Sequence, residues 1–175
     1  MAQLSCQERK NEIILFKLNG TKTTFSELNI SSLNAYVFLS PECPLSEASL
    51  IELNRLDSVY IDRGYSTHII IPGELYSTEE IESFKTTFNI TLPIYIDKHY
   101  KLCDSLKALV TPEYFLLDKN KSLLYQGAID DRAIDNDIVR QSINTYYAQD
   151  AIQSALNNQI IRITKTKAVG CYIER

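Results

Sequence analysis

The sequence lacks the features that mark several common classes of partner. Its 18 lysines and arginines are scattered among 22 aspartates and glutamates, the formal net charge at pH 7 is −4, and no basic stripe is present. A basic stripe is what binds a phosphate backbone, so we do not expect nucleic acid as a partner. All apolar runs are shorter than the roughly 18 to 20 residues that cross a bilayer, and internal repeats are absent. The sequence therefore predicts neither a membrane-spanning helix nor a repeat protein.

The chain also lacks closely spaced cysteines. Four cysteines are present, far apart in the sequence: Cys6, Cys43, Cys103 and Cys171. They form no C-x-x-C motif, and the histidines that accompany them are His68 and His99. A structural zinc site uses cysteine and histidine ligands at short, regular spacings. We therefore expect no bound metal.

The length and composition predict a single folded domain. With 175 residues, 45% of them hydrophobic, the chain can bury one large core but is too short for two ordinary domains. Residues 1–11 are polar and have no evident partner, so we expect them to be disordered. The folded domain is expected over residues 12–157. Residues 158–175 form a C-terminal extension whose strand-like alternation has no clear place in a sheet.

Hydrophobic patterns predict alternating strands and helices. Strands are expected in apolar runs bounded by turn residues, at residues 12–18, 34–40, 66–72, 92–97, 112–118 and 122–127. Helices are expected where apolar residues recur at helical spacing, from Pro44 to Gly64, after Ser77, and over residues 98–109 and 137–157. Residues 19–29 are interpreted as a turn and a polar connection. Because parallel neighbours need helical crossovers, this order predicts an α/β fold with a central mixed β-sheet flanked by helices.

The stretch LSPECPLSEASL, residues 39–50, places Cys43 where a buried strand ends and a helix begins. Pro44 suits the first helical turn, because its missing N–H would have no partner there. Free N–H groups and the positive end of the helix dipole favour a thiolate, and can lower a cysteine pKa from about 8.5 to between about 3.5 and 7.5. The alternative is a small buried residue without chemistry. Proline on each side and the polar Glu42 argue against burial, so we predict that Cys43 is an exposed nucleophile.

Three segments together resemble the thioredoxin superfamily, in particular its redoxin-domain, membrane-associated thiol-disulfide oxidoreductases. They are VFLSPECPLSE, LVTPEYFLLDKNKSLLYQGAIDD and KAVGCYIE, the last of which resembles the Gly-Cys ending of one redoxin subgroup. The resemblance covers roughly residues 12–132 and implies a three-layer, thioredoxin-like α/β fold. It also implies that the Thr111–Pro112 peptide bond is cis and that Pro112 lies beside Cys43. Thr111 and Glu113 then belong to the loop that faces a substrate.

The sequence departs from this family at one position. Members that work through a dithiol have C-x-x-C, and Ser46 stands in the place of the second cysteine. Its hydroxyl can hydrogen-bond a thiolate but cannot attack a mixed disulfide. Three interpretations stay open: an external thiol resolves the mixed disulfide on Cys43, or Cys171 or Cys103 acts as a distant resolving cysteine, or Ser46 replaces a cysteine to trap intermediates. The helical pattern favours core packing for Cys103, whereas Cys171 lies near a terminus whose mobility could bring it to another thiol.

The expected function is that of a thiol-disulfide oxidoreductase or isomerase. Its partners would be protein disulfide substrates and an external thiol reductant, and it would need no cofactor. In relatives, the cis-proline loop binds an extended substrate segment through backbone hydrogen bonds. A peroxiredoxin-type peroxidase is an alternative, because Ser40 could stand for the hydroxyl of the peroxide pocket, although Tyr36 occupies the place of its proline. A redox-inactive thioredoxin-like module that binds a partner is a third interpretation, favoured by the missing C-x-x-C motif.

The start of the chain bears on its location. MAQLSCQERKNE resembles the processed end of a bacterial lipoprotein, with Cys6 as the lipid attachment site. On that interpretation the protein is periplasmic, or tethered to the membrane through Cys6 and facing the periplasm. Otherwise Cys6 is an ordinary residue of a disordered start and the protein is cytoplasmic.

Overall fold

The computed structural model describes residues 12–135 and 138–175. Cys6 and the rest of the predicted disordered start lie outside the described residues. The main feature is a seven-stranded sheet with the order β2-β1-β5-β4-β3-β7-β8. Its strands are β1 (Ile14–Lys17), β2 (Lys22–Thr24), β3 (Leu33–Phe38), β4 (Tyr65–Pro72), β5 (Ile94–Asp97), β7 (Glu113–Asp118) and β8 (Leu123–Gly127). The neighbours β3, β4 and β5 are parallel and the other pairs antiparallel, so the sheet is mixed, as predicted.

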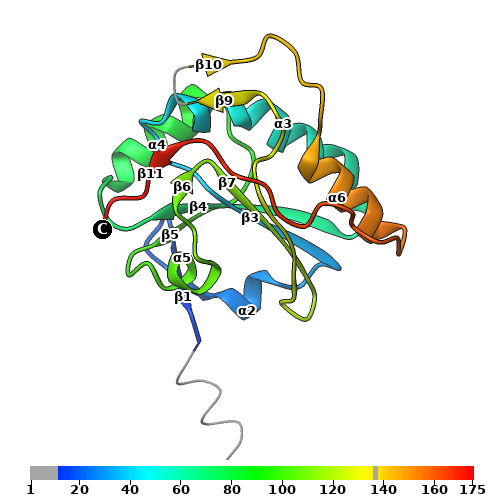
Figure 1. Ribbon diagram of the computed structural model, residues 1–175. Coiled ribbons are helices and arrows are strands. Elements are labelled where there is room, and N and C mark those ends of the chain that lie inside the picture. Colours follow the sequence, from blue (N-terminus) through cyan, green and yellow to red (C-terminus); the bar gives the residue numbers. More distant parts are fainter. Residues whose placement is uncertain (1–11, 136–137) are drawn as a thin grey trace, which may run out of the picture.

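Helices cover both faces of this sheet and give three layers (Figure 1). Helices α3, α4 and α6 pack on one face, and α2 and α5 on the other. Their bounds are α2 (Phe25–Leu28), α3 (Pro44–Tyr60), α4 (Thr78–Thr87), α5 (Lys101–Leu106) and α6 (Tyr147–Leu156). Four short strands lie outside the main sheet: β6 (Val110–Thr111), β9 (Ala133–Asp135), β10 (Ile138–Val139) and β11 (Cys171–Tyr172). Among the described residues, no helix has both the length and the apolar character to cross a membrane.

The strand that leads to Cys43 is buried along its whole length. Every residue of β3 is buried, because helices cover both of its faces. Its side chains alternate between two cores: Val37 packs on the side of α3, and Tyr36 and Phe38 pack on the side of α2 and α5. The carboxyl end of this rigid central strand therefore fixes the position of the loop that carries Cys43.

Helix α3 begins where the sequence predicts. Pro44 occupies its first turn, and Cys43 is the extended N-cap residue, with φ −92° and ψ 113°. Leu53 and Leu56 are fully buried in the core between α3 and the sheet. A short 3-10 turn, η2 (Ile61–Arg63), follows the helix, and Gly64 ends it at φ +83°, a conformation that glycine adopts without strain.

The segment over residues 19–29 is more structured than the predicted polar connection. It contains β2, which pairs with β1, and the short helix α2. Thr24 and Glu27 form a capping box, in which each side chain accepts the backbone N–H of the other residue. Phe25 and Leu28 of α2 are buried in the second core. The polar residues that suggested a loop are therefore the caps of a short buried helix.

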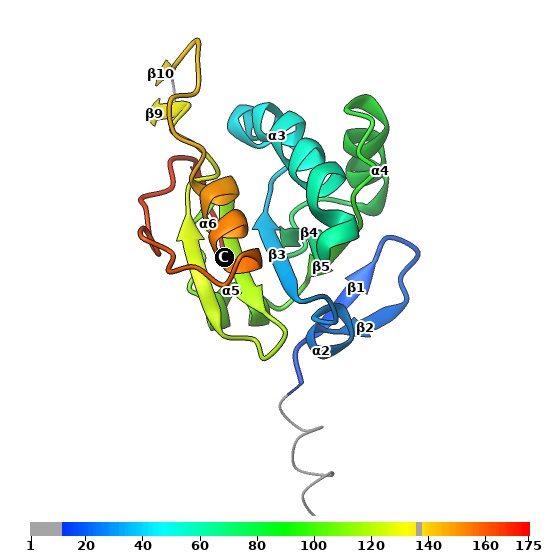
Figure 2. The ribbon, with the colours of Figure 1, turned by 90° about the vertical axis from the view of Figure 1, so that its right-hand side faces the viewer.

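The helix predicted over residues 137–157 is wrong in its first half. The described part of that half contains β10, which pairs with β9 in a small hairpin that stands out from the rest of the fold (Figure 2). Helix α6 starts only at Tyr147. The Asp131 carboxylate accepts the backbone N–H groups of Asn144 (2.8 Å) and Thr145 (3.1 Å), and these bonds hold the chain before α6 in a loop.

The C-terminal extension, for which the sequence suggested no place, lies along the domain (red in Figure 1). Lys165 forms a parallel bridge with Gln126 of β8. Further on, β11 pairs with β6 in antiparallel orientation. The extension thus crosses from the edge of the main sheet to the segment that precedes Pro112.

Candidate active site

Cys43 is buried, contrary to the exposed position predicted from its neighbours. Only 1% of Cys43 is exposed. Its Sγ lies 3.0 Å from the carbonyl oxygen of Thr111 and 2.8 Å from the Sγ of Cys171. These residues are 68 and 128 positions away in the chain. The neighbouring prolines and Glu42 indicate only the local environment of Cys43. They could not predict that the distant Thr111 and Cys171 segments bury it.

The loop beside Cys43 is the one that joins β6 to β7. The Thr111–Pro112 peptide bond in it is cis, as the resemblance implied. Thr111 is buried, and its carbonyl accepts a hydrogen bond from the protonated Cys43 thiol. Thr111, one of the two residues predicted for a substrate loop, therefore lies next to the predicted nucleophile.

Cys171 is placed by strand pairing rather than by mobility of the chain end. It lies opposite Thr111 in the β6–β11 pair, and its thiol donates to the Cys43 sulfur at 2.8 Å. Gly170 lies against the same Thr111: a Cβ on Gly170 would be 2.2 Å from the Thr111 carbonyl oxygen. The Gly-Cys pair at the end of the chain thus has a geometric reason, because a glycine there lets the backbone approach closely enough to bring the two sulfurs together.

The polar contacts of Cys43 decide its protonation. Burial raises its pKa, but hydrogen bonds from the side chain and backbone of Cys171, and from the backbone and hydroxyl of Ser46, outweigh burial and lower the pKa. The Thr111 carbonyl binds only the protonated thiol and opposes this effect. Donors outnumber the acceptor, so Cys43 has more thiolate character than an ordinary cysteine.

Cys171 has the opposite balance. Burial raises its pKa, and so do the hydrogen bond that it donates to Cys43 and the negative charge on that sulfur, to about 11. The pKa of Cys43 is therefore the lower of the two, and Cys43 loses its proton before Cys171 does.

Ser46, in the place of the second cysteine of C-x-x-C, is fully buried one turn into α3. Its hydroxyl accepts the backbone N–H of Ser40 at 3.1 Å and hydrogen-bonds Cys43. Ser46 therefore joins the loop after β3 to the first turn of α3 and supports the thiolate.

Cys103, the other resolving cysteine considered from sequence, belongs to the second core, as its helical pattern indicated. Its thiol donates to the carbonyl of Ala108 at 3.4 Å, and the Arg175 guanidinium lies 3.7 Å from its sulfur. Burial raises the pKa of Cys103 more than the Arg175 charge lowers it. The structure thus brings Cys171, and not Cys103, to Cys43.

Glu113 follows Pro112 but is held by the backbone of its own loop. Its carboxylate accepts the N–H groups of Leu109 (2.8 Å) and Val110 (3.4 Å). Burial raises its pKa, and these backbone hydrogen bonds counteract the rise in part. Glu113 therefore shapes the segment that contains β6.

A cavity of about 450 Å³ opens beside the two sulfurs. The charged residues in its lining are all acidic: Glu42, Glu80 and Glu174. Ser40 also lines it and shares a hydrogen bond of 2.7 Å with the hydroxyl of Tyr76, a wall residue that no sequence pattern marks. Tyr36, in the place of the peroxiredoxin proline, instead stacks on His68 in the second core.

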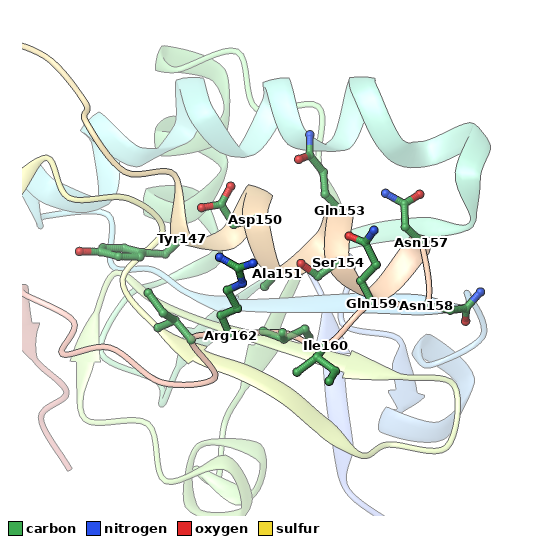
Figure 3. A pocket seen from close by; sticks show the side chains of 12 residues that line it. Tyr147, Asp150, Ala151, Gln153, Ser154, Asn157, Asn158, Gln159, Ile160 and Arg162 are labelled. Carbon is green, nitrogen blue, oxygen red and sulfur yellow. The ribbon is translucent and has the colours of Figure 1, made fainter.

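A larger hollow, of about 900 Å³, lies between α6 and the chain that follows it (Figure 3). Tyr147, Asp150 and Arg162 are among its lining residues, and it contains no cysteine or histidine. Across the described part of the chain, no group of three or more His, Cys, Asp or Glu residues is arranged to hold a metal ion. The reactive groups of the candidate site are therefore the two neighbouring sulfurs of Cys43 and Cys171.

Comparison with known proteins identifies the fold. No family model and no curated protein matches the sequence. Among solved structures, an uncharacterized conserved protein from Geobacillus kaustophilus has a TM-score of 0.81 at 20% identity and covers 94% of this chain and 88% of its own. A putative thiol:disulfide interchange protein DsbE from Chlorobium tepidum has a TM-score of 0.65 at 16% identity and covers 83% of this chain and 93% of its own. The exposed lipoprotein thioredoxin from Streptococcus pneumoniae has a TM-score of 0.59 at 16% identity, over 84% of this chain and 98% of its own.

The chain has a thioredoxin-like fold. The three-layer arrangement predicted from the resemblance is thus confirmed. Identities of 16 to 20% show the fold alone.

Proposed function

We propose that this protein is a thiol-disulfide oxidoreductase that acts on protein disulfides, with Cys43 as nucleophile and Cys171 as resolving thiol. The observation that carries the proposal is the 2.8 Å contact between the two sulfurs at the start of α3. The lowered pKa of Cys43 supports its role as nucleophile, because the thiolate is the reactive form. The cis-proline loop beside it supports a protein substrate.

The first step is attack of the Cys43 thiolate on one sulfur of a substrate disulfide. A bond forms between Cys43 Sγ and that sulfur, the substrate S–S bond breaks, and the second substrate sulfur leaves as a thiolate. The negative charge thus passes from Cys43 to the departing sulfur. The product is a mixed disulfide between protein and substrate.

The second step is attack of Cys171 on the Cys43 sulfur. In the mixed disulfide Cys43 carries no negative charge, so the charge and hydrogen bond that raise the pKa of Cys171 are gone, although its burial remains. Cys171 then loses its proton more easily and displaces the substrate as a thiolate. The substrate disulfide is reduced and the protein dithiol is oxidised to a Cys43–Cys171 disulfide. Two molecules of an external thiol then reduce this disulfide and leave joined as a disulfide of their own. This cycle uses no cofactor.

The test is a single turnover of the reduced chain with a peptide disulfide, followed by mass spectrometry. The unaltered protein should end as a Cys43–Cys171 disulfide without added thiol. Cys171→Ser should stop at a mixed disulfide on Cys43, and Cys43→Ser should form no adduct. Cys103→Ser is the matched control and should behave as the unaltered protein.

Two other results would replace this proposal. The absence of any adduct, with tight binding of the same peptide, would leave a redox-inactive binding module. Oxidation of Cys43 by hydrogen peroxide with no reaction toward peptide disulfides would favour the peroxidase, for which the Ser40 and Tyr76 hydroxyls beside the cysteine would be the pocket.

A location outside the cytoplasm fits this activity, because disulfides persist in oxidising compartments. The similar structure from Streptococcus pneumoniae is described as an exposed lipoprotein. The proposal therefore includes lipid attachment at Cys6, which lies outside the described residues. Mass spectrometry of the Cys6 peptide from native membranes should show the lipid, and an unmodified Cys6 in a cytosolic fraction would contradict it.

A further inference from the structure

The last six residues, 170–175, form a strap across the active site. In the strap, Cys171 lies opposite Thr111 in the antiparallel β6–β11 pair. The Ile173 N–H donates to the carbonyl of Leu109 at 3.0 Å. An extended substrate segment adds to a sheet edge through such backbone groups. The strap therefore occupies the edge that a substrate of the proposed oxidoreductase would use.

The strap also covers the nucleophile. Cys43 is 1% exposed, with the Cys171 sulfur seated 2.8 Å from its own. An external disulfide has to place one of its sulfurs against Cys43 in order to react. A substrate sulfur and the Cys171 sulfur cannot both lie against Cys43. The strap must therefore leave before Cys43 attacks the substrate disulfide.

The strap is held mainly by surface contacts; among its side chains only the partly buried Ile173 packs against the second core. Cys171, Glu174 and Arg175 are exposed, and Tyr172 is 80% exposed. Arg175 pairs with Asp104 of α5 at 2.7 Å, and both side chains are about half exposed, at 52% and 49%. Exposed ion pairs contribute little, and segments with few buried apolar contacts open without unfolding the domain. The strap can therefore detach while the fold stays intact.

The chain just before the strap is anchored more firmly. The Thr166 hydroxyl accepts the Ala128 N–H at 2.9 Å and shares a hydrogen bond of 2.6 Å with the hydroxyl of Tyr125, which is fully buried. A released strap therefore moves about residues 167–169 and stays close to the site. A tethered thiol keeps a high effective concentration at its partner.

We infer that the strap is an internal substitute for substrate: its release admits an extended cysteine-containing segment to the edge of β6, and its return delivers Cys171 to the mixed disulfide. This inference rests on the function proposed above. The bound substrate cysteine takes the place of Cys171, so the residue before it takes the place of Gly170 against the Thr111 carbonyl. The edge should therefore select disulfide segments with glycine before the cysteine.

The return of the strap completes the chemistry by strand exchange. The strap displaces the substrate strand from β6 while the Cys171 thiolate attacks the Cys43 sulfur. The Cys43–substrate S–S bond breaks, the Cys43–Cys171 bond forms, and the substrate leaves as a thiolate. The strap therefore first blocks Cys43 and later resolves the mixed disulfide on it.

The first experiment measures access to Cys43 in the Cys171→Ser background. Its alkylation by iodoacetamide is followed against pH with peptide-resolved mass spectrometry. At the high-pH plateau Cys43 is fully deprotonated in every variant. Differences in the plateau rate therefore report access to Cys43 and not differences in its pKa. Gly170→Val, which adds a clash, and Ile173→Pro, which removes a hydrogen bond, should each raise the plateau by at least about fivefold. Arg162→Ala, an exposed residue of the same extension before the Thr166 anchor, is the matched control and should not change it.

The second experiment follows single turnovers of the chain with Cys171 present. Ile173→Pro should speed formation of the mixed disulfide and slow its resolution, whereas general damage to the fold would slow both. Two peptides that differ only in Gly or Val before the cysteine should differ by at least about fivefold in the first step. Unchanged plateau rates in the strap variants, with mixed disulfides still forming, would overturn the strap and leave the oxidoreductase intact. No mixed disulfide in any variant would overturn the oxidoreductase itself.

Discussion

At the scale of single residues, the site depends on the donors and acceptors around one sulfur. Burial alone would make Cys43 a poor nucleophile, and the hydrogen bonds from Cys171 and Ser46 reverse that effect. Ser46 cannot act as a resolving residue, because a hydroxyl cannot attack a mixed disulfide. In the proposed cycle, the second thiol comes from a residue 128 positions away from Cys43 in the chain.

Ser46→Ala tests the hydroxyl. The change should raise the pKa of Cys43, because a donor to the thiolate is lost, and lower the free energy of unfolding by about 1 kcal/mol, because the Ser40 N–H loses its acceptor. Alkylation rate against pH and urea denaturation measure the two effects. Ser49→Ala, in the next turn of α3, removes a hydroxyl that bonds only the Ser46 carbonyl, and it should leave the Cys43 midpoint in place. Equal midpoints for both variants would contradict the role of Ser46.

At the scale of elements, α3 both carries the nucleophile and fills the core. Its N-terminus holds Cys43, while Leu53 and Leu56 on one face are fully buried. Residues on its opposite face, such as Ile51, are exposed. Because β3 is buried along its whole length and one face of α3 packs in the core, the Cys43 end of the site is fixed, whereas the Cys171 end lies on a two-residue strand. In the proposed cycle, β11 is therefore the element expected to move.

Leu53→Ala and Ile51→Ala separate the two faces of α3. Leu53 is fully buried, so its truncation should lower the free energy of unfolding by about 2 to 5 kcal/mol. Ile51 is 75% exposed, so the same change there should stay within about 0.5 kcal/mol. Urea denaturation of both variants provides the comparison. Similar losses would show that the face of α3 is assigned wrongly.

At the scale of the whole molecule, the charge around the site predicts which disulfides approach it. The net charge is −4, and the charged residues that line the cavity beside the sulfurs are all acidic. A field of one sign around a cleft raises the local concentration of oppositely charged ligands. Cationic disulfide segments and cationic thiols should therefore approach this site more readily than anionic ones.

Cystamine and oxidised glutathione test this selection with small disulfides of opposite charge. At low salt, cystamine should oxidise the reduced protein at least about tenfold faster than oxidised glutathione does. Added salt screens exposed charges, so it should lower the ratio of these two rates. Glu42→Gln, in the cavity wall, should also narrow the ratio. Glu79→Gln on α4 removes an exposed carboxylate that is not part of the lining, and should leave the ratio unchanged. A faster reaction with oxidised glutathione would refute the electrostatic argument.

Local patterns were enough for the elements that build one half of the site. Three of these local features are present in the structure: the apolar run of β3, Pro44 at the first turn of α3, and the Ser77 capping box of α4. Each depends on residues that are close together in the sequence. The same holds for Cys43 at the strand-to-helix junction. Helix α6 was placed too early because Asp131, outside the predicted helix, holds the preceding loop.

What only the tertiary structure decided is the other half of the site. The sequence by itself determined the α/β order and placed Cys43 at the start of a helix, because these features depend on near neighbours. It could not determine that Cys43 is buried or that Cys171 is its partner, because both facts depend on the pairing of β11 with β6. That pairing joins segments about sixty residues apart through backbone hydrogen bonds, which leave no side-chain pattern to read. Gly170 is the residue in the sequence that reflects this pairing. The reason for a glycine there is the close approach of the Thr111 carbonyl, which only the structure shows.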